Sequence, residues 1–371
     1  MRRLVLLGGG HAHVKVLADL ALRPLAGWDV HLVSPYRRQI YSGMLPGWVA
    51  GHYPIESCAI AIERLAAKAG LRFHETAGVG IEPDRRVLAC ADGTRLSFDR
   101  LSVDTGPLPA IGDLPGSAVH ALPIRPIEDF VAAWPGLVER IRSRCRRFDL
   151  VVLGAGAAGV ELAFAIRQRA LAEAWSHVFV TLAGTGELPL EGSPIGLRRR
   201  VAHLLAQRGI AWRGRHRACA IEAGRIVLEQ GPPLAFDTCW VVTGAAAPDW
   251  ARASGVATDA QGFIRVDRTL QSVSHPWILA AGDVAAYADP RTKSGVYAVR
   301  AGPVLAANLR ALCEGRAPVE WTPQTRALYL LSTGNRYALA AWGRWFLEGD
   351  WIWRWKDRID RRFVRQSTDA A

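Results

Sequence analysis

The pattern that most constrains this chain is an apolar run that ends in glycines and occurs twice. Residues 4–10 read LVLLGGG, and residues 150–156 read LVVLGAG. Each run has the length of a buried strand, and a stretch with helical spacing follows each of them. A strand that turns through glycines into a helix is the opening βα unit of a dinucleotide-binding sheet. The sequence therefore predicts an α/β protein with two such units.

The second unit has the complete glycine fingerprint of this fold. Gly154 permits the tight bend, Gly156 lets the backbone approach a pyrophosphate, and Gly159 allows the helix to pack closely on the strand. The free N–H groups and the dipole of the following helix favour negative phosphates. Residues 183–184, where a ribose-binding acid is expected, are Ala and Gly, so the pattern leaves NAD and NADP open.

The first unit departs from the fingerprint at its third position. Gly8 and Gly10 are present, but His13 stands where the third glycine is expected. The imidazoles of His11 and His13 either donate hydrogen bonds to phosphate or are merely accommodated by the turn. Ser34 follows the second strand in place of the usual acid, and its hydroxyl is a candidate partner for a ribose.

Later segments follow the order found in one flavoprotein family. Two strands end in Thr-Gly, at residues 105–106 and 243–244, and residues 278–283 read ILAAGD. Together with the glycine turns, these segments make the chain similar to the flavoproteins with two dinucleotide-binding domains, the pyridine nucleotide-disulfide oxidoreductase superfamily. The resemblance implies two Rossmann-like domains, with the second inserted in the first.

The resemblance also implies domain limits and cofactor contacts. An FAD-binding domain is expected in residues 1–112 and 265–322, an NAD(P)H-binding domain in residues 113–264, and a hairpin with a Trp/Arg-rich amphipathic tail in residues 323–371. The positions expected to hold FAD are Gly8, Gly10, His13, Ser34, Ser42, Gly43, Val79, Thr105, Gly106, Gly282, Asp283 and Val296. Those expected to hold the nicotinamide nucleotide are Gly154, Gly156, Gly159, Thr243 and Gly244.

The cysteine pattern narrows the chemistry within this family. No two of the six cysteines are spaced as C-x-x-C, which argues against a redox disulfide and against a metal site. Cys145 and Cys313 match no sulfur-handling motif, so a sulfide:quinone oxidoreductase is a lesser alternative. The main expectation is an FAD-dependent NAD(P)H oxidoreductase, similar to NADH dehydrogenases, that delivers electrons to an acceptor such as a quinone.

Three residues are candidates for a direct part in electron transfer. Glu161 matches a nicotinamide-contacting Glu in relatives, although the helix dipole alone also favours a carboxylate there. Tyr297 and Arg300 lie on the helix expected to face the flavin, where Tyr297 would stack and Arg300 would stabilise a reduced flavin or bind an anionic acceptor. Val296 and Arg300 replace two Gln that type II NADH dehydrogenases carry, which weakens the case for a quinone.

A closer resemblance supplies a second hypothesis. Residues 8–14 (GGGHAHV), 41–47 (YSGMLPG) and 355–363 (WKDRIDRRF) look like the NADH dehydrogenase-like flavoprotein often fused to selenide, water dikinase. The alternative function is therefore a flavoprotein partner of selenide, water dikinase in selenium metabolism, with little NADH turnover.

Charge and hydropathy set the expected partners and location. The chain carries 46 Lys and Arg against 34 Asp and Glu, a net charge of +12, but no nucleic-acid recognition motif accompanies the excess. We therefore expect no nucleic-acid partner. The sequence predicts no transmembrane stretch and no signal peptide, so the expected location is cytoplasmic, with peripheral contact at the inner membrane face as an addition.

The tail is the segment from which membrane contact is expected. Residues 350–365 predict a helix, although the alternation of Trp351, Trp353 and Trp355 also permits a strand. The predicted aromatic face consists of Trp351, Ile352, Trp355, Ile359 and Phe363. Such a face, flanked by arginines, either lies in a membrane interface or packs on the protein itself.

Overall fold

The computed structural model describes residues 1–110 and 114–369 and contains two five-stranded parallel sheets. The first sheet has the order β21-β9-β1-β2-β5, and all its neighbouring strands are parallel. Its strands are β1 (Arg2–Leu7), β2 (Trp28–Val33), β5 (Arg72–His74), β9 (Arg100–Val103) and β21 (Ile278–Ala280). In sequence, β21 follows the whole second sheet, so the second sheet is an insertion in the first.

The second sheet repeats the plan of the first. Its order is β11-β18-β12-β13-β14, again with parallel neighbours. Its strands are β11 (Leu122–Pro123), β12 (Phe148–Leu153), β13 (Val178–Ala183), β14 (Ala211–Arg213) and β18 (Thr238–Val241). The two connections between the sheets run side by side, because β10 (Leu108–Pro109) pairs antiparallel with β19 (Ala245–Ala246).

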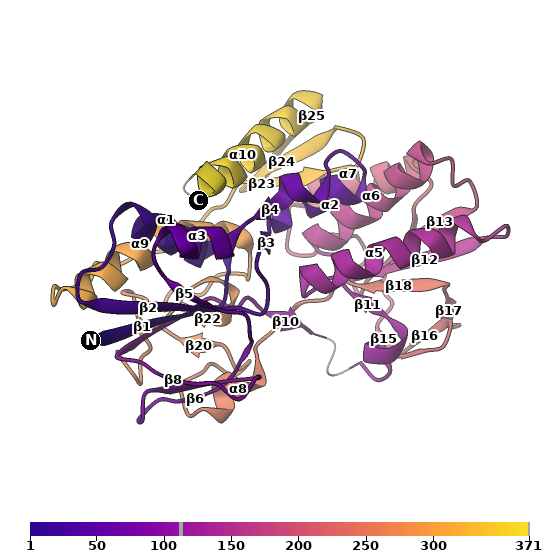
Figure 1. Cartoon of the computed structure of the whole chain (residues 1–371). Coiled ribbons are helices and arrows are strands. Elements are labelled where there is room, and N and C mark those ends of the chain that lie inside the picture. The colour runs from indigo at the N-terminus through magenta and orange to yellow at the C-terminus, as the bar shows by residue number, and fades with distance from the viewer. Residues whose placement is uncertain (111–113, 370–371) are drawn as a thin grey trace.

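Helices and small antiparallel sheets cover the faces of both parallel sheets. Figure 1 shows α1 (His11–Leu22), α3 (Ile62–Lys68) and α9 (Gly295–Cys313) above the first sheet. Below it lie β6 (Gly78–Glu82), β7 (Val87–Cys90) and β8 (Arg95–Ser97). The second sheet carries α5 (Ile127–Arg142), α6 (Ala157–Ala172) and α7 (Ile195–Gln207), with β15 (Ala218–Glu222), β16 (Arg225–Leu228) and β17 (Leu234–Ala235) below.

The apolar runs recognised in the sequence are the central strands of these sheets. Residues 4–7 of β1 and 150–153 of β12 are buried, as expected for parallel strands that are covered on both faces. The α/β fold with two dinucleotide-binding units is therefore confirmed. Among the helices, α5 is one that the pattern did not predict, and it contains Pro135 within its length.

Short elements connect these layers. They are β3 (Gln39–Ile40), η1 (Ser42–Met44), α2 (Leu45–Val49), η2 (Ile55–Cys58), β4 (Ala59–Ile60), α4 (Ser117–His120), α8 (Asp249–Ala253), β20 (Ile264–Arg265), η3 (Gly282–Val284) and β22 (Ala285–Ala286).

The C-terminal segment forms a three-stranded antiparallel sheet and a long helix. The sheet consists of β23 (Tyr329–Ser332), β24 (Ala338–Trp342) and β25 (Trp345–Gly349), and α10 (Asp350–Asp369) follows directly. In Figure 1 this yellow segment lies across the top of the molecule, between the helices of the first sheet and those of the second. The predicted helix is confirmed, and the strand alternative is wrong.

The predicted single aromatic face of that helix is also wrong, because the structure divides it into two stripes. Ile352 and Phe363 are buried against the protein, whereas Trp351, Trp355 and Ile359 are 51%, 41% and 40% exposed. The exposed residues follow one another at a spacing of four, so they form their own stripe on the helix. No helix in the described part of the chain is long and apolar enough to cross a membrane.

Candidate functional site

The first glycine turn lies at the carboxyl ends of β1 and β9. Gly8 has a φ of +96°, and a Cβ added there would lie 2.3 Å from the carbonyl oxygen of Asp104. Only glycine therefore permits this close crossing of the two strands. The Asp104 carboxylate accepts hydrogen bonds from the N–H groups of Ala12 and His13, at 2.8 and 2.9 Å, in the first turn of α1.

His13 stands at the position of the third glycine, and its side chain is buried between α1 and the first sheet. Its Nδ1 lies 2.5 Å from the carbonyl oxygen of Gly8, and its Nε2 lies 2.8 Å from the hydroxyl oxygen of Ser102. Burial lowers the pKa of His13 to about 4, so the ring is neutral at pH 7 and bridges the turn to β9. Both ring nitrogens are used inside the protein, so the hypothesis that this ring donates to phosphate does not fit the geometry.

His11 opens α1 and faces a different environment. Its Nε2 atom is buried and has no hydrogen-bond partner among the described residues. Its ring lies 5.4 Å from the ring of Tyr41 and stacks at 6.0 Å on that of Phe363, which belongs to α10. Burial, aided by Arg125, lowers the pKa of His11 to about 4. An unpartnered polar atom at a helix N-terminus is a reason to expect a ligand there.

Arg125 is a residue of this site that sequence reasoning missed. Its Nη1 lies 3.6 Å from Oδ2 of Asp283, which is buried in η3, just after β21. Burial raises the pKa of Asp283, while Arg125 and Lys293 oppose that rise. Arg125 comes from the segment that enters the second sheet, so only the tertiary structure brings it to the first.

The first residue of η1 and the start of α9 meet above the same strand ends. A Cβ on Gly295 would lie 3.6 Å from the hydroxyl oxygen of Ser42. The Ser294 hydroxyl accepts a hydrogen bond from the N–H of Val296 at 3.4 Å and caps α9. On this helix Tyr297 is buried, whereas Arg300 is exposed. The stacking expected of Tyr297 and the charge role expected of Arg300 stay predictions.

The remaining positions predicted for FAD lie in two different settings. Thr105 is exposed, and a Cβ on Gly106 would meet no atom within 4 Å, so there is open space at the end of β9. Ser34 is buried, and its hydroxyl donates to the carbonyl of Tyr36 at 3.0 Å. Its proton is therefore used within the turn. Val79 on β6 is half-exposed.

The second glycine turn has the geometry expected of the complete fingerprint. A Cβ on Gly154 would lie 2.5 Å from the carbonyl oxygen of Val242, and one on Gly159 would lie 1.8 Å from that of Gly154. Gly156 meets nothing within 4 Å and is exposed at the start of α6. The hydroxyl of Thr243 donates to the carbonyl of Ala110 at 3.0 Å. This helix end is therefore open to an anion.

Polar side chains of three distant segments meet beneath the C-terminal helix. Lys356 Nζ donates to the carbonyl of Gly43 and to Oδ2 of Asp360, both at 2.6 Å. The Tyr41 hydroxyl is hydrogen-bonded to Asp360, and Glu161 of α6 is close enough to raise the pKa of Lys356. This group is named the tail cluster below. It fixes α10 over the loop that is expected to approach the flavin.

Glu161 belongs to this cluster more clearly than to a nucleotide site. Its Oε1 accepts a hydrogen bond from the N–H of Ser332 at 2.8 Å, in the C-terminal sheet. Burial raises the pKa of its carboxyl to about 7, and the nearby Lys356 acts in the opposite direction. Its side chain is only partly covered, so a nicotinamide contact stays a prediction for it.

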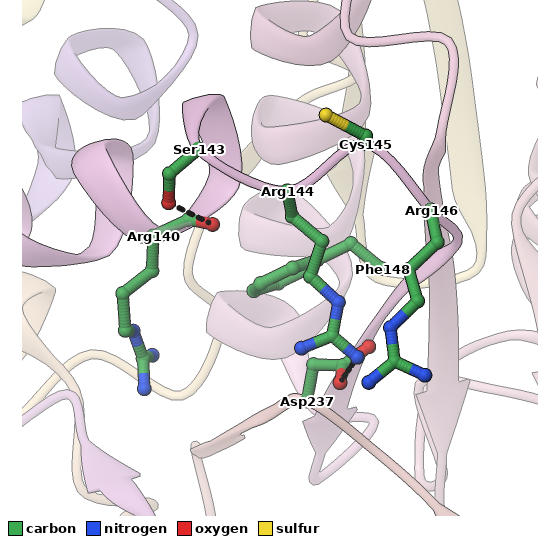
Figure 2. A pocket seen from close by; sticks show the side chains of 7 residues that line it. All are labelled: Arg140, Ser143, Arg144, Cys145, Arg146, Phe148 and Asp237. Carbon is green, nitrogen blue, oxygen red and sulfur yellow. Dashed lines mark hydrogen bonds and ion pairs between the residues drawn. The ribbon is translucent and has the colours of Figure 1, made fainter.

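A separate pocket of about 620 Å³ lies away from the glycine turns. Figure 2 shows Arg140, Arg144 and Arg146 around it, near Cys145, with Arg144 paired to Asp237. It lies at the end of α5 and the beginning of β12. Dinucleotides bind at the carboxyl ends of parallel strands, so this pocket is at the wrong end of the sheet for the nicotinamide nucleotide.

The cysteines are not arranged for sulfur chemistry at the strand ends. All six are free thiols. Cys313 is buried at the last residue of α9, the end opposite to the one that meets Ser42, and Cys145 lies at the basic pocket. Cys58 lies against η1, with its Sγ 4.0 Å from the carbonyl oxygen of Met44. Burial raises its pKa to about 12, which suppresses the reactive thiolate.

Comparison with known proteins connects this geometry to a family. Residues 2–302 match the family model described as pyridine nucleotide-disulphide oxidoreductase. An NADH dehydrogenase-like protein of Mycobacterium tuberculosis is 28% identical over 299 residues, which cover 77% of this chain and 73% of the relative. The demethylphylloquinone reductase NdbB of Synechocystis is 25% identical over 314 residues, which cover 80% and 76%.

A solved structure extends the likeness to the C-terminal segment. The sulfide:quinone oxidoreductase of Aquifex aeolicus superposes with a TM-score of 0.82 and covers 100% of this chain and 92% of its own. Its sequence identity is 18%, so this likeness shows a shared fold alone.

Proposed function

Because the chain belongs to the pyridine nucleotide-disulphide oxidoreductase family, we propose that it is an FAD-dependent enzyme that oxidises NAD(P)H and reduces an acceptor such as a quinone. The observation that carries the proposal is the pair of glycine turns, each at the carboxyl end of its own parallel sheet. One turn serves each dinucleotide. NADH dehydrogenase-like proteins and a demethylphylloquinone reductase are among its relatives, which supports both the electron donor and the acceptor class.

The residues around the first turn fit FAD. The open space beside Gly106, the unpartnered Nε2 of His11 and the guanidinium of Arg125 suit a long molecule with a central pyrophosphate. Asp283, at the end of β21, suits a chain of hydroxyl groups. When bound, FAD would supply the chemistry of taking up a hydride and passing on electrons, which no side chain supplies.

The protein's own contribution is to orient the reactants and exclude water. The N-terminus of α9 meets the loop of Ser42, so its dipole favours negative charge at that point. The tail cluster holds the same loop through the carbonyl of Gly43. Arg300 is exposed on α9, where it is available to an anionic acceptor.

The exposed apolar surface at the C-terminus supports the proposal of a cytoplasmic location with peripheral contact at the inner membrane face. On the hairpin, Trp345 and Leu347 are 70% and 60% exposed, and they share a face of β25. A Cβ on Gly349 would lie 2.8 Å from the ring of Trp351, which joins this face to the exposed stripe of α10. We name this surface the Trp face: Trp342, Trp345, Leu347, Trp351, Trp355 and Ile359. Arg354, Arg358 and Arg362 are exposed beside it on α10, a combination suited to anionic lipid.

Anaerobic titration of the flavin-loaded protein with NADH and with NADPH tests this function. We expect stoichiometric bleaching of the flavin absorbance by one of them and recovery on addition of a soluble quinone. Bound flavin that neither nucleotide reduces would contradict the proposal and favour the alternative of a flavoprotein partner in selenium metabolism. Failure to bind flavin would contradict both.

A further inference from the structure

The two glycine turns differ in the residue that lies beneath them. Because both units have the same βα arrangement, the two residues can be compared directly. The first glycine of each turn packs on the backbone of the residue that directly follows the neighbouring strand: Gly8 on Asp104, after β9, and Gly154 on Val242, after β18. Asp104 and Val242 therefore occupy equivalent places beneath α1 and α6. One is a carboxylate and the other is an apolar side chain.

The carboxylate of Asp104 already occupies the anion-binding end of α1. It accepts the N–H groups of Ala12 and His13, two of the donors that a helix leaves unpaired in its first turn. Beneath α6, Val242 offers no such acceptor, and that helix begins at residues that are exposed. At the first turn, a side chain of the protein thus provides the negative charge at the helix N-terminus. At the second turn, the helix N-terminus is left open for a ligand.

Two glycines of the expected cofactor motifs make room for the Asp104 carboxylate in this position. A Cβ on Gly10 or on Gly282 would lie 2.4 Å from its carboxylate, so both glycines are needed to make room for it. The side chain is 2% exposed, and no cation among the described residues contributes to the shift of its pKa. A charged carboxylate and a bound pyrophosphate would therefore repel each other across the end of one helix with little screening.

We propose that Asp104 takes up a proton from solvent when FAD binds, so that FAD affinity depends on pH while the nucleotide site of α6 lacks this coupling. This inference rests on the FAD binding proposed above. In the free protein the carboxylate satisfies the helix end, and in the complex the neutral acid keeps its acceptor oxygen on Ala12 and His13 without opposing the phosphates. The proton that forms the O–H bond of Asp104 leaves hydronium or the protonated buffer, and no other bond is made or broken.

The groups around Asp104 are consistent with this assignment. From α1 it receives the N–H groups of Ala12 and His13. The imidazoles of His11 and His13 on this helix are both neutral at pH 7, because burial lowers their pKa values to about 4. From η3 it faces Asp283, and from the loop beyond β22 it faces Tyr287. Burial, with a contribution from Asp283, raises the pKa of Asp104 to about 7. Arg125 lies against Asp283 and not against Asp104.

Calorimetric titration of flavin-free protein with FAD tests the inference directly. At pH 8, in two buffers of different ionisation enthalpy, we expect uptake of up to about one proton per FAD, and at pH 5.5 almost none. Between pH 7 and pH 9 the dissociation constant should rise by at most about tenfold per pH unit. FAD binding without proton uptake at pH 8 would overturn the inference and leave the proposed function standing.

Matched variants assign the proton to one carboxyl. Asp104→Asn keeps an acceptor oxygen but has no proton to gain, so its FAD affinity should be independent of pH and should exceed that of the wild type at pH 8. Asp29→Asn removes a carboxylate from β2 of the same sheet and should keep the wild-type profile. An Asp104→Asn protein with the wild-type pH profile would refute the assignment. Should that variant not fold, the wild-type proton uptake still decides, and absence of FAD binding at every pH would overturn the inference together with the proposed function.

Discussion

At the scale of single residues, His13 shows why the first dinucleotide turn tolerates a bulky side chain. The third glycine normally keeps the helix close to the strand. Here the imidazole points into the sheet and uses both nitrogens, on the Gly8 carbonyl and the Ser102 hydroxyl. The position is therefore filled by a buried hydrogen-bonded bridge, which makes His13 a positioning residue for the turn.

Removing one end of this bridge should destabilise the protein. Ser102→Ala leaves the buried Nε2 of His13 without its partner, and we expect a loss of about 1–3 kcal/mol in the free energy of unfolding. Urea titration measures it. His13→Ala should cost more because it also leaves a cavity, and the double variant should cost less than the sum of the two. Strict additivity would show that the two side chains do not interact.

The buried carboxyl of Glu161 should make the free energy of unfolding depend on pH, because burial raises its pKa in the folded state. A folded carboxyl with its pKa raised to about 7 keeps its proton where the unfolded chain has released it. Stability from this group is therefore present at low pH and is lost as pH rises from about 4.5 to 7. Glu161→Gln should weaken this decline by at most about 1.4 kcal/mol per pH unit.

Chemical denaturation at several pH values, beside NAD(P)H kinetics, measures the effect of this substitution. An unchanged pH dependence of stability combined with a raised KM for NAD(P)H would contradict the structural role. It would instead support the nicotinamide contact predicted for Glu161 from the sequence.

At the scale of elements, α10 has one stripe of residues that packs on the protein and another that faces solvent. The inner stripe buries Ile352, Lys356, Asp360 and Phe363, and the outer stripe leaves its tryptophans in solvent. The Tyr53 hydroxyl donates to Asp357 at 2.7 Å and ties the side of the helix to the segment after α2. The helix is thus anchored by polar contacts as much as by apolar ones.

Breaking the tail cluster should be costly. Lys356→Met leaves Asp360 buried without its cation, and we expect a loss of about 3–5 kcal/mol in the free energy of unfolding. Denaturant titration and protease susceptibility of the tail both report it. Arg354→Met removes an exposed ion pair with Asp350 on the same helix and should cost less than about 1 kcal/mol. Equal losses in the two variants would show that the buried pair has no special role.

At the scale of the whole molecule, the C-terminal segment joins both halves and presents a surface of its own. The lower face of its sheet meets the second unit, where Glu348 pairs with Arg200 of α7 at 2.7 Å. Phe363 reaches the first unit at His11. The Trp face is left on the outside, so one segment both covers the proposed flavin site and exposes aromatic side chains.

Sedimentation with lipid vesicles tests whether this surface binds membranes. The protein should bind anionic vesicles more tightly than zwitterionic ones, and added salt should weaken the binding. Trp351→Ser with Trp355→Ser should lower the partition coefficient by more than about tenfold, since each buried side chain contributes about 1.5–3 kcal/mol. Leu171→Ser, an exposed apolar residue on α6, serves as the control and should bind as the wild type does. Equal binding by all three proteins would contradict a membrane role for the Trp face.

The sequence by itself determined the architecture, because strand-length apolar runs and glycine turns are local patterns that each specify a βα unit. It also predicted α10 as a helix, from its cap and spacing. It did not indicate which stripe of α10 is buried, because Trp351 and Ile352 are both large and largely apolar, and only the packing partner decides between them. Likewise, Arg125, Asp104 and Lys356 are far in sequence from the turn or loop they support. Charge interactions of this kind depend on distances across the fold, so only the tertiary structure decided them.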